Sequence, residues 1–262
     1  YNFGAFAPFN WANRGNALIL MYHRFSREQD SLKVSAAEFK SHLEYLKKNH
    51  RVLSLSETTN YFQEGKTLPP NAAVITIDDG YKDAYEIAFP LLKKFEMPAT
   101  VYAITDFLDE KCWLWTDLMR FCMLNTKADA VKIGFGENDF VAANLTDEKQ
   151  RFETASRLNS RLKKLLNQQK EAKIKEIAED LQVKIPKLPT KDFAPINWSQ
   201  AREMDAENVR IESHTVTHPI LTNISEKELD FEMQTSKKRL EEVLERRVEH
   251  FCYPNGSFNE NV

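Results

Sequence analysis

Short apolar runs alternate with amphipathic segments along most of this chain. The apolar runs fall at 17–22, 51–55, 72–77, 99–104, 208–212 and 249–253. Each run has the length of a strand, and most of them are separated by segments with helical periodicity. This alternation is typical of parallel strands joined by crossover helices. The pattern therefore predicts an α/β fold in which helices cover a parallel sheet.

Three of the intervening segments carry clear helical signals. In the segment 35–49, apolar residues recur on one face, and Ser35 followed by Glu38 is the signature of a capping box. The segments 83–96 and 225–246 show the same periodicity. These helices are expected to connect successive strands of the sheet.

The alternation breaks between about residues 111 and 195. This region begins with Trp113 and Trp115, has a hairpin signal at 134–139, and continues in helical stretches rich in Lys and Glu. We expect one domain over residues 1–262 that contains this region as an insertion. Because insertions at the carboxyl ends of strands commonly form lids, a lid is the expected role.

Composition narrows the classes of partner. The net charge is −3, with 36 basic and 39 acidic residues, so nucleic acid is not an expected partner. No run approaches the roughly 20 apolar residues of a transmembrane span, and no signal peptide is visible. The aromatic, uncharged stretch from Tyr1 to Trp11 indicates peripheral membrane contact or, equally, packing on the domain. A cytoplasmic or membrane-peripheral location is therefore favoured, although the sequence does not fix the compartment.

Two separated motifs together indicate a metal site. Asp78 and Asp79 follow the apolar run 72–77, so they are expected at the carboxyl end of a buried strand. His214 and His218 are four residues apart, and on a helical turn both imidazoles would reach one ion. Two imidazoles and one carboxylate leave coordination positions open for water and substrate. The alternatives are a chance histidine pair on a polar turn and an Asp-Gly turn signal.

The two motifs resemble signatures of the polysaccharide deacetylase family, the NodB-homology carbohydrate esterases. That family has a strand ending in T-F-D-D-G and a turn of the form H-[ST]-x-x-H. The corresponding segments here are Thr76-Ile77-Asp78-Asp79-Gly80 and His214-Thr215-Val216-Thr217-His218. The resemblance covers roughly residues 17–110 and 196–258. It implies that Asp78 is the general base and that Asp79 and both histidines bind a divalent metal, expected to be zinc, with cobalt, nickel or iron also compatible.

A third family signature, R-x-P-x-G, is matched only in part. The chain has Cys252 where the family has arginine, followed by Tyr253, Pro254, Asn255 and Gly256. In the family the arginine orients the base, so the partner of Asp78 is open. Arg24 is one candidate, and the alternative for Arg24 is a surface ion pair. The resemblance also suggests that the Tyr253 amide contacts an oxyanion and that Pro254 stiffens the loop.

The general acid of the family is a histidine at a strand end. Here the run 17–22 ends at His23, an order that resembles the circularly permuted branch containing the biofilm poly-N-acetylglucosamine deacetylases. His23 is thus the candidate acid, and a core histidine is the alternative. The implied fold is a distorted (β/α) barrel of about seven parallel strands. Since only six runs are found before the end at Val262, the barrel is expected to be incomplete at the C-terminus.

The resemblance implies metal-dependent hydrolysis of N-acetyl groups. The expected substrate is an N-acetylhexosamine-containing glycan or a lipid-linked sugar, on whose rings Trp113 and Trp115 would stack unless they are core residues. Asp78 would deprotonate a metal-activated water, and His23 would protonate the departing amine. Two alternatives stay open: an O-acetyl esterase with the same metal site, and a catalytically silent glycan-binding barrel.

Overall fold

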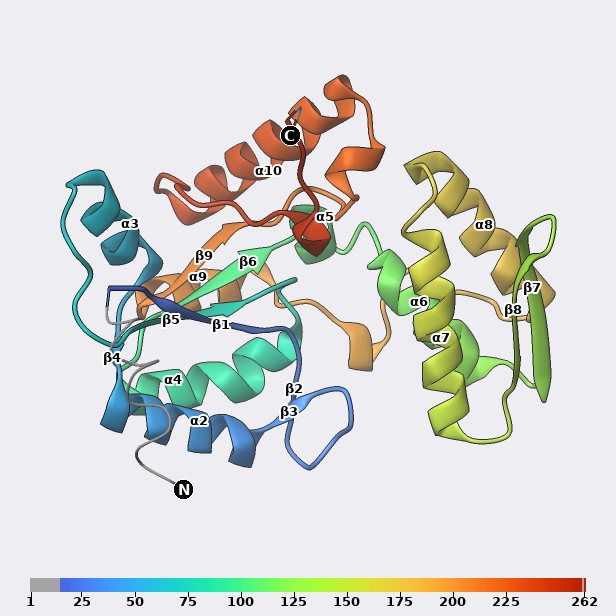
Figure 1. Cartoon of the computed structure of the whole chain (residues 1–262), viewed down its shortest axis with the longest axis horizontal. Coiled ribbons are helices and arrows are strands. Elements are labelled where there is room, and N and C mark those ends of the chain that lie inside the picture. The colour runs from blue at the N-terminus through green and yellow to red at the C-terminus, as the bar shows by residue number, and fades with distance from the viewer. Residues whose placement is uncertain (1–14, 261) are drawn as a thin grey trace.

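The computed structural model describes residues 15–260 and 262. The aromatic stretch predicted to contact a membrane lies outside these residues. Among the described residues, no helix combines the length and the apolar composition that a bilayer span needs. The parallel α/β architecture predicted from the sequence is confirmed (Figure 1).

Five parallel strands form the central sheet of the described chain. They are β1 (Leu18–Tyr22), β4 (Arg51–Val52), β5 (Ala72–Ile77), β6 (Ala99–Ala103) and β9 (Val209–Ser213). The order is β1-β5-β6-β9, and β4 pairs with the first residues of β5. Every residue of β5 is buried, as its unbroken apolar sequence requires of a central parallel strand. Two short strands, β2 (Phe25–Ser26) and β3 (Val34–Ser35), pair beside the sheet.

Helices connect these strands and cover them. They are α2 (Ala36–Asn49), α3 (Leu55–Gln63), the π-helix η1 (Ala84–Ala88), α4 (Phe89–Phe95), α5 (Thr105–Leu108), α9 (Trp198–Ala206) and α10 (Glu226–Leu244). In Figure 1, α2 and α4 lie below the strands and α10 lies above them. Capping boxes at Ser35 and Ser225 start α2 and α10, so the predicted helix starts are confirmed. Short 3₁₀ turns are η2 (Lys191–Phe193), η3 (Leu221–Asn223) and η4 (Pro254–Gly256).

Asp109 ties three helices together at one point. Its carboxylate accepts hydrogen bonds from Trp198 of α9 at 2.7 Å, from Arg239 of α10 at 2.8 Å and from Lys111 at 2.8 Å. Burial opposes ionisation, but these three donors outweigh it and lower the pKa of Asp109 to about 2.

The sheet is open in the described part of the chain. The predicted strand at 249–253 contributes only a parallel bridge between Phe251 and Ser213. At the opposite edge, Leu18, Ile19 and Met21 of β1 are 48, 58 and 61% exposed. A closed barrel of seven strands is therefore not seen among the described strands.

The predicted insertion has an apolar core of its own. It contains α6 (Trp115–Asn125), the antiparallel hairpin β7 (Ala130–Gly136) and β8 (Asp139–Asn144), α7 (Glu148–Leu162) and α8 (Asn167–Asp180). The hairpin predicted around residues 134–139 is confirmed. Ile220, close after the second histidine of the motif, also packs into this core. The insertion is thus joined to the loop that carries the site.

Candidate metal and acid–base site

The strand β5 places two carboxylates at the carboxyl edge of the sheet. Asp78 and Asp79 directly follow β5, and they are 4 and 7% exposed. Asp79 has a φ of 74°, a left-handed conformation that turns its side chain away from the strand direction. Gly80 follows with a φ of 81°, and a Cβ there would lie 3.1 Å from Leu108 Cδ1. The chain therefore requires glycine at this turn for both conformation and space.

The histidine motif is not helical. His214 follows β9 directly, and the segment to His218 is a loop in which Thr215 and His218 have φ values of 74° and 61°. The prediction that a helical turn aligns the two imidazoles is thus wrong, although the side chains do converge. A hydrogen bond from His218 N to Thr215 Oγ1 at 2.9 Å closes the loop. The ring centroids of the two histidines are 4.8 Å apart.

Asp79 and the two histidines form a compact donor set. His214 Nε2 and His218 Nε2 each lie 3.6 Å from Asp79 Oδ1. This separation is long for a hydrogen bond, but ligand atoms about 2.1 Å from a tetrahedral ion lie roughly 3.4 Å apart. His214 Nδ1 is held at 2.8 Å by the carbonyl of Cys252, which leaves Nε2 free for an ion. The spacing therefore fits a metal ion shared by the three residues.

The protonation preferences of these groups agree with that fit. Burial lowers the pKa of His214 to about 4 and lowers the pKa of His218 well below its usual value, so both imidazoles are neutral and can donate a lone pair. Burial, reinforced by Asp78, raises the pKa of Asp79 well above its usual value. A cation beside Asp79 would remove this penalty. The nitrogen and oxygen donors match zinc and other first-row divalent ions.

Glu232 of α10 holds the histidine loop through hydrogen bonds to its carboxylate. Its Oε2 accepts from the amides of Val216 at 2.7 Å and Thr217 at 2.9 Å, and its Oε1 accepts from Thr217 Oγ1 at 2.5 Å. Sequence reasoning missed this residue because α10 is rich in charge. The available signal was periodicity, since Glu232 shares one face with the buried residues Ser236 and Leu240.

Asp78 lies beside the donor set, with a carboxylate oxygen within 4.8 Å of a nitrogen of His214, and it also approaches two other groups. Its Oδ2 lies 3.8 Å from His23 Nε2 and 3.9 Å from Cys252 Sγ, while its Oδ1 has no hydrogen-bond partner in the described structure. Burial raises the pKa of Asp78 to about 6, and the thiol contact lowers it only in part. The side chain of His23 is 46% exposed, so it can meet a ligand from solvent. A buried carboxylate and an exposed imidazole thus lie side by side at the ends of two neighbouring strands.

Arg24 does not partner Asp78. Its Nε donates to Asp83 Oδ2 at 2.7 Å, its Nη2 contacts the carbonyl of Asp192, and its guanidinium lies 3.9 Å above the Tyr81 ring. The prediction that Arg24 replaces the missing arginine is corrected by these contacts. The physical reason is that the nearer carboxylate of Asp83, just beyond β5, takes the charge.

The two tryptophans are packed within the insertion. Trp115 is 6% exposed, and its indole donates to the carbonyl of His218 at 3.1 Å. Trp113 packs against Phe121 and Phe193, and its indole donates to Pro186. Burial leaves no free face of Trp115 for a sugar ring, so the core alternative holds for that residue.

The third motif lies beside Asp78, as its sequence position suggested. Pro254 is buried and begins the turn η4, in which Asn255 has a φ of 58°. The ring of Tyr253 packs against Phe251 and Phe258. Cys252, where the arginine was expected, therefore contacts both motifs: its carbonyl accepts from His214 Nδ1 and its thiol lies near Asp78.

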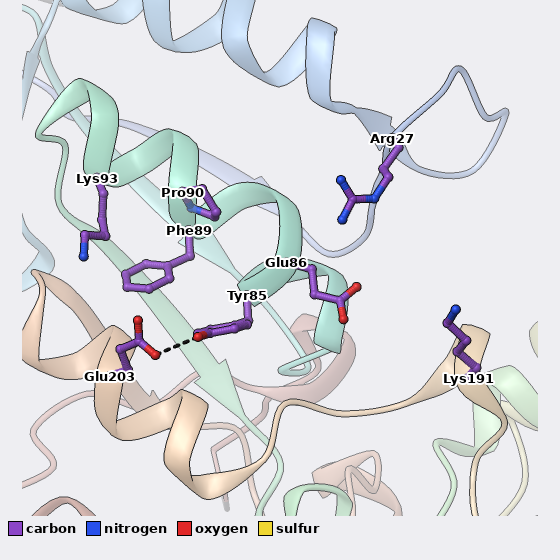
Figure 2. A pocket seen from close by; sticks show the side chains of 8 residues that line it. All are labelled: Arg27, Tyr85, Glu86, Phe89, Pro90, Lys93, Lys191 and Glu203. Carbon is purple, nitrogen blue, oxygen red and sulfur yellow. Dashed lines mark hydrogen bonds between the residues drawn. The ribbon is translucent and has the colours of Figure 1, made fainter.

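A wide groove of about 770 Å³ contains none of the predicted site residues (Figure 2). It lies over η1, α4 and α9, where the Tyr85 hydroxyl donates to Glu203 at 2.6 Å. On its other side, Glu86 lies between Arg27 and Lys191 in this view. The size of the groove is thus no guide to the position of the acid–base site.

The comparison with family models decides the affiliation. Residues 65–262 match the model of the family described as polysaccharide deacetylase. The chain belongs to the polysaccharide deacetylase family. The family resemblance inferred from the motifs is confirmed, and membership indicates a hydrolase.

Individual relatives are more distant. The Bacillus subtilis protein YxkH is 24% identical over 245 residues, which cover 93% of this chain and 58% of YxkH. The poly-beta-1,6-N-acetyl-D-glucosamine N-deacetylase of Staphylococcus epidermidis is 33% identical over 111 residues, or 36% of this chain and 38% of that enzyme. The matched regions thus span only part of these relatives.

Solved structures confirm the fold. The Streptococcus pyogenes deacetylase PplD, solved with acetate, has a TM-score of 0.58 at 19% identity, covering 94% of this chain and 76% of PplD. IcaB from Ammonifex degensii has a TM-score of 0.58 at 17% identity, covering 95 and 77% of the two chains. At this identity the likeness concerns the fold alone.

Proposed function

We propose that this protein is a metal-dependent deacetylase that hydrolyses N-acetyl groups of an N-acetylhexosamine-containing glycan. The observation that carries the proposal is the division of labour at the sheet edge. Asp79, His214 and His218 converge on one point, while the second carboxylate, Asp78, lies next to this set with its Oδ2 3.8 Å from His23. A binding module has no need for a second buried carboxylate held next to a histidine. The family and the staphylococcal relative support a poly-N-acetylglucosamine type of substrate.

The donor set would hold one divalent ion, for which zinc is the best match. Bound there, the ion supplies Lewis acidity toward the acetyl carbonyl and toward the attacking water. His214 keeps its coordinating nitrogen oriented because its other nitrogen is fixed by the Cys252 carbonyl. Glu232 keeps the histidine loop in its left-handed conformation.

Asp78 acts as the general base in this proposal. With a pKa of about 6 it is mostly ionised at neutral pH, and it is still basic enough to accept a proton from water. Water adds its oxygen to the acetyl carbon while its proton passes to Asp78. Burial lowers the pKa of His23, so its imidazole is mostly neutral until the proton that Asp78 took from water passes to it across 3.8 Å. The carbon–nitrogen bond then breaks, and His23, exposed on the neighbouring strand, gives that proton to the departing amine. The Tyr253 amide is proposed to stabilise the oxyanion, and Pro254 to hold that loop rigid.

The insertion is proposed to act as a lid within one domain of the (β/α) barrel class. Two contacts join it to the site: the indole of Trp115 binds the carbonyl of His218, and Ile220 packs into the core of the insertion. A lid anchored so close to a metal ligand would restrict which glycans enter.

The test is acetate release from N-acetylglucosamine oligomers by zinc-reconstituted protein. Asp78→Asn is expected to lower kcat by at least about 100-fold, because a general base contributes roughly 10²–10⁴. His23→Ala is expected to lower kcat similarly, with zinc content unchanged in both variants. His50→Ala, which removes a histidine outside the site, is the matched control and should retain full activity.

Loss of activity in the control, or full activity in Asp78→Asn, contradicts the proposed roles. Release of acetate from O-acetylated oligomers only would instead assign an O-acetyl esterase. Tight zinc binding without release from either substrate would favour the silent glycan-binding barrel.

A further inference from the structure

A second pocket, of about 260 Å³, lies between the insertion and the β2–β3 loop. Its walls come from α6 and α7, which run side by side (Figure 1). Leu32 closes it from the loop. The chemistry of its walls is set by Thr116, Arg120, Phe152, Ser156, Asn159 and Lys163. The members on α7 recur at helical spacing, so they form one continuous face.

Arg120 is the central feature of this pocket. Its guanidinium lies 4.7 Å from the ring centroid of Phe152 and 5.8 Å from that of Phe193. Its Nε is buried and has no hydrogen-bond partner, and among the described residues no carboxylate lies within ion-pair distance. Aromatic rings can fix a guanidinium without using its N–H groups. Arg120 is thus held ready with its donors unused.

The carboxylates nearest to Arg120 are engaged elsewhere. Asp117, one turn back on α6, accepts the hydroxyl of Tyr81 at 2.7 Å. Asp30 accepts the amide of Leu32 at 2.7 Å. Burial, with the charge of Arg24 adding to it, lowers the pKa of Arg120, and the two acids offset this only in part. A half-buried guanidinium with a buried, unpartnered Nε suits an anionic ligand.

The remaining polar groups suit a tetrahedral oxyanion on a sugar. Lys163 adds a second cation at the rim, with no ion pair among the described side chains. Ser156 offers a hydroxyl at the same wall. Asn159 donates to the carbonyl of Thr116 at 2.8 Å, and its Oδ1 is buried without a partner. That oxygen can accept a hydrogen bond from a sugar hydroxyl or from a protonated phosphate. A site for a fully ionised anion alone would not need such an acceptor.

Both walls of the pocket are bonded to the loop that carries the candidate metal ligand. Thr116 follows Trp115, whose indole binds the carbonyl of His218. The carbonyl of Lys163 accepts from Asn223 Nδ2 at 3.0 Å, five residues after that histidine. The pocket and the histidine loop are therefore joined by contiguous structure, so that a ligand in one can affect the other.

We propose that this pocket binds a phosphate group carried by the glycan substrate. Arginine pairs with phosphate through two parallel N–H bonds, and lysine neutralises a further charge. The proposal rests on the proposed function only for the identity of the glycan, because binding of phosphate to the pocket is independent of hydrolysis. Free inorganic phosphate shares the recognised chemistry, so the experiment must separate the two sources.

Calorimetric titration of the zinc-loaded protein with N-acetylglucosamine 1-phosphate, inorganic phosphate and neutral N-acetylglucosamine tests the proposal. The sugar phosphate is expected to bind tightest. Arg120→Gln and Lys163→Met should each weaken its binding by roughly tenfold or more, the usual effect of removing a charged hydrogen-bond partner. Lys164→Met removes the same charge from the next residue, which does not line the pocket, and should bind like the parent.

If Lys163→Met and Lys164→Met bind the sugar phosphate equally well, the proposed pocket is overturned. It is also overturned if inorganic phosphate binds every variant as tightly as it binds the parent protein. If inorganic phosphate binds as tightly as the sugar phosphate, the glycan is not the source of the anion and that part is overturned. Lys163 is exposed, so its variant keeps the test valid if Arg120→Gln does not fold. If the parent protein binds the sugar phosphate but releases no acetate from N-acetylglucosamine oligomers, only the proposed function is refuted.

Discussion

Glu232→Gln is the most informative single substitution, because it removes charge from beneath the histidine loop without changing the size of the side chain. The carboxylate accepts three hydrogen bonds from Val216 and Thr217, and Glu232 is 5% exposed. A glutamine keeps one oxygen for the two amides, and its NH₂ group faces the hydroxyl of Thr217, which can rotate and accept. The variant therefore keeps the three contacts but replaces charge-assisted hydrogen bonds by neutral ones.

The magnitude follows from the charge lost from these three bonds. A hydrogen bond to a charged group contributes roughly 1.5–3 kcal/mol and a neutral one roughly 0.5–1.5 kcal/mol. Because each of the three bonds loses about 1 kcal/mol, we expect the free energy of unfolding to fall by about 2–4 kcal/mol. His218 holds its φ of 61° within the loop that Glu232 supports. Zinc affinity should therefore fall about 10- to 100-fold, as for other outer partners of metal ligands.

Two assays on the same samples decide the matter. Zinc affinity is measured by competition with a chromophoric chelator, and stability by urea unfolding of the metal-free protein. Asp230→Asn, an exposed change on the same helix, is the control and should alter neither value. Unchanged zinc affinity in a folded Glu232→Gln protein would show that the loop keeps its conformation without the carboxylate, and the reasoning would be refuted.

Three further predictions concern single contacts. Trp115→Phe removes the indole donor to the His218 carbonyl and should weaken zinc binding several-fold, about 1 kcal/mol, whereas Trp113→Phe should leave zinc affinity unchanged in the same competition assay. Asp109, with its pKa of about 2, should contribute about 1 kcal/mol of stability after allowance for solvent screening. That contribution is fully present above about pH 4, the ordinary pKa of aspartate, and is lost as the pH falls toward 2. The unfolding curves of Asp109→Asn and of the parent protein should therefore differ at pH 7 and converge at acid pH. Gly80→Ala, at a φ of 81°, should destabilise by about 1–3 kcal/mol, and equal melting temperatures would contradict the strain argument.

The sequence was sufficient for those parts of the fold that depend on local patterns. The unbroken apolar run 72–77 is a fully buried strand, and the Ser35 and Ser225 boxes begin their helices where the pattern placed them. Short apolar runs and caps are encoded by neighbouring residues, so they can be recognised without knowing the tertiary structure. The pairing of strands is not local, and the last predicted strand forms only one bridge, at Phe251.

The sequence indicated which side chains lie together at the sheet edge but not the geometry that brings them there. The spacing of His214 and His218 predicted convergence through a helical turn, whereas two left-handed residues produce convergence through a loop. Such backbone conformations at residues other than glycine are sustained by tertiary contacts. Here these contacts are the hydrogen bonds that the amides of Val216 and Thr217 donate to Glu232. The partner of Arg24 also depends on tertiary structure. Asp83 lies beside Arg24 because β5 pairs with β1, and local sequence does not predict that pairing.

The environment of Asp78 supports the proposed base role even though the arginine of the third family motif is absent. Within the described chain, the contacts of its carboxylate are the thiol of Cys252 and the imidazole of His23, and neither is a fixed cation. The rise in pKa caused by burial is therefore offset only weakly, and the pKa of Asp78 reaches about 6. An arginine would orient the carboxylate but would also lower its pKa and weaken it as a base. In the proposed mechanism, Cys252 in that position leaves the orientation of Asp78 to the backbone of the turn after β5, and the carboxylate keeps more of its basicity toward the attacking water.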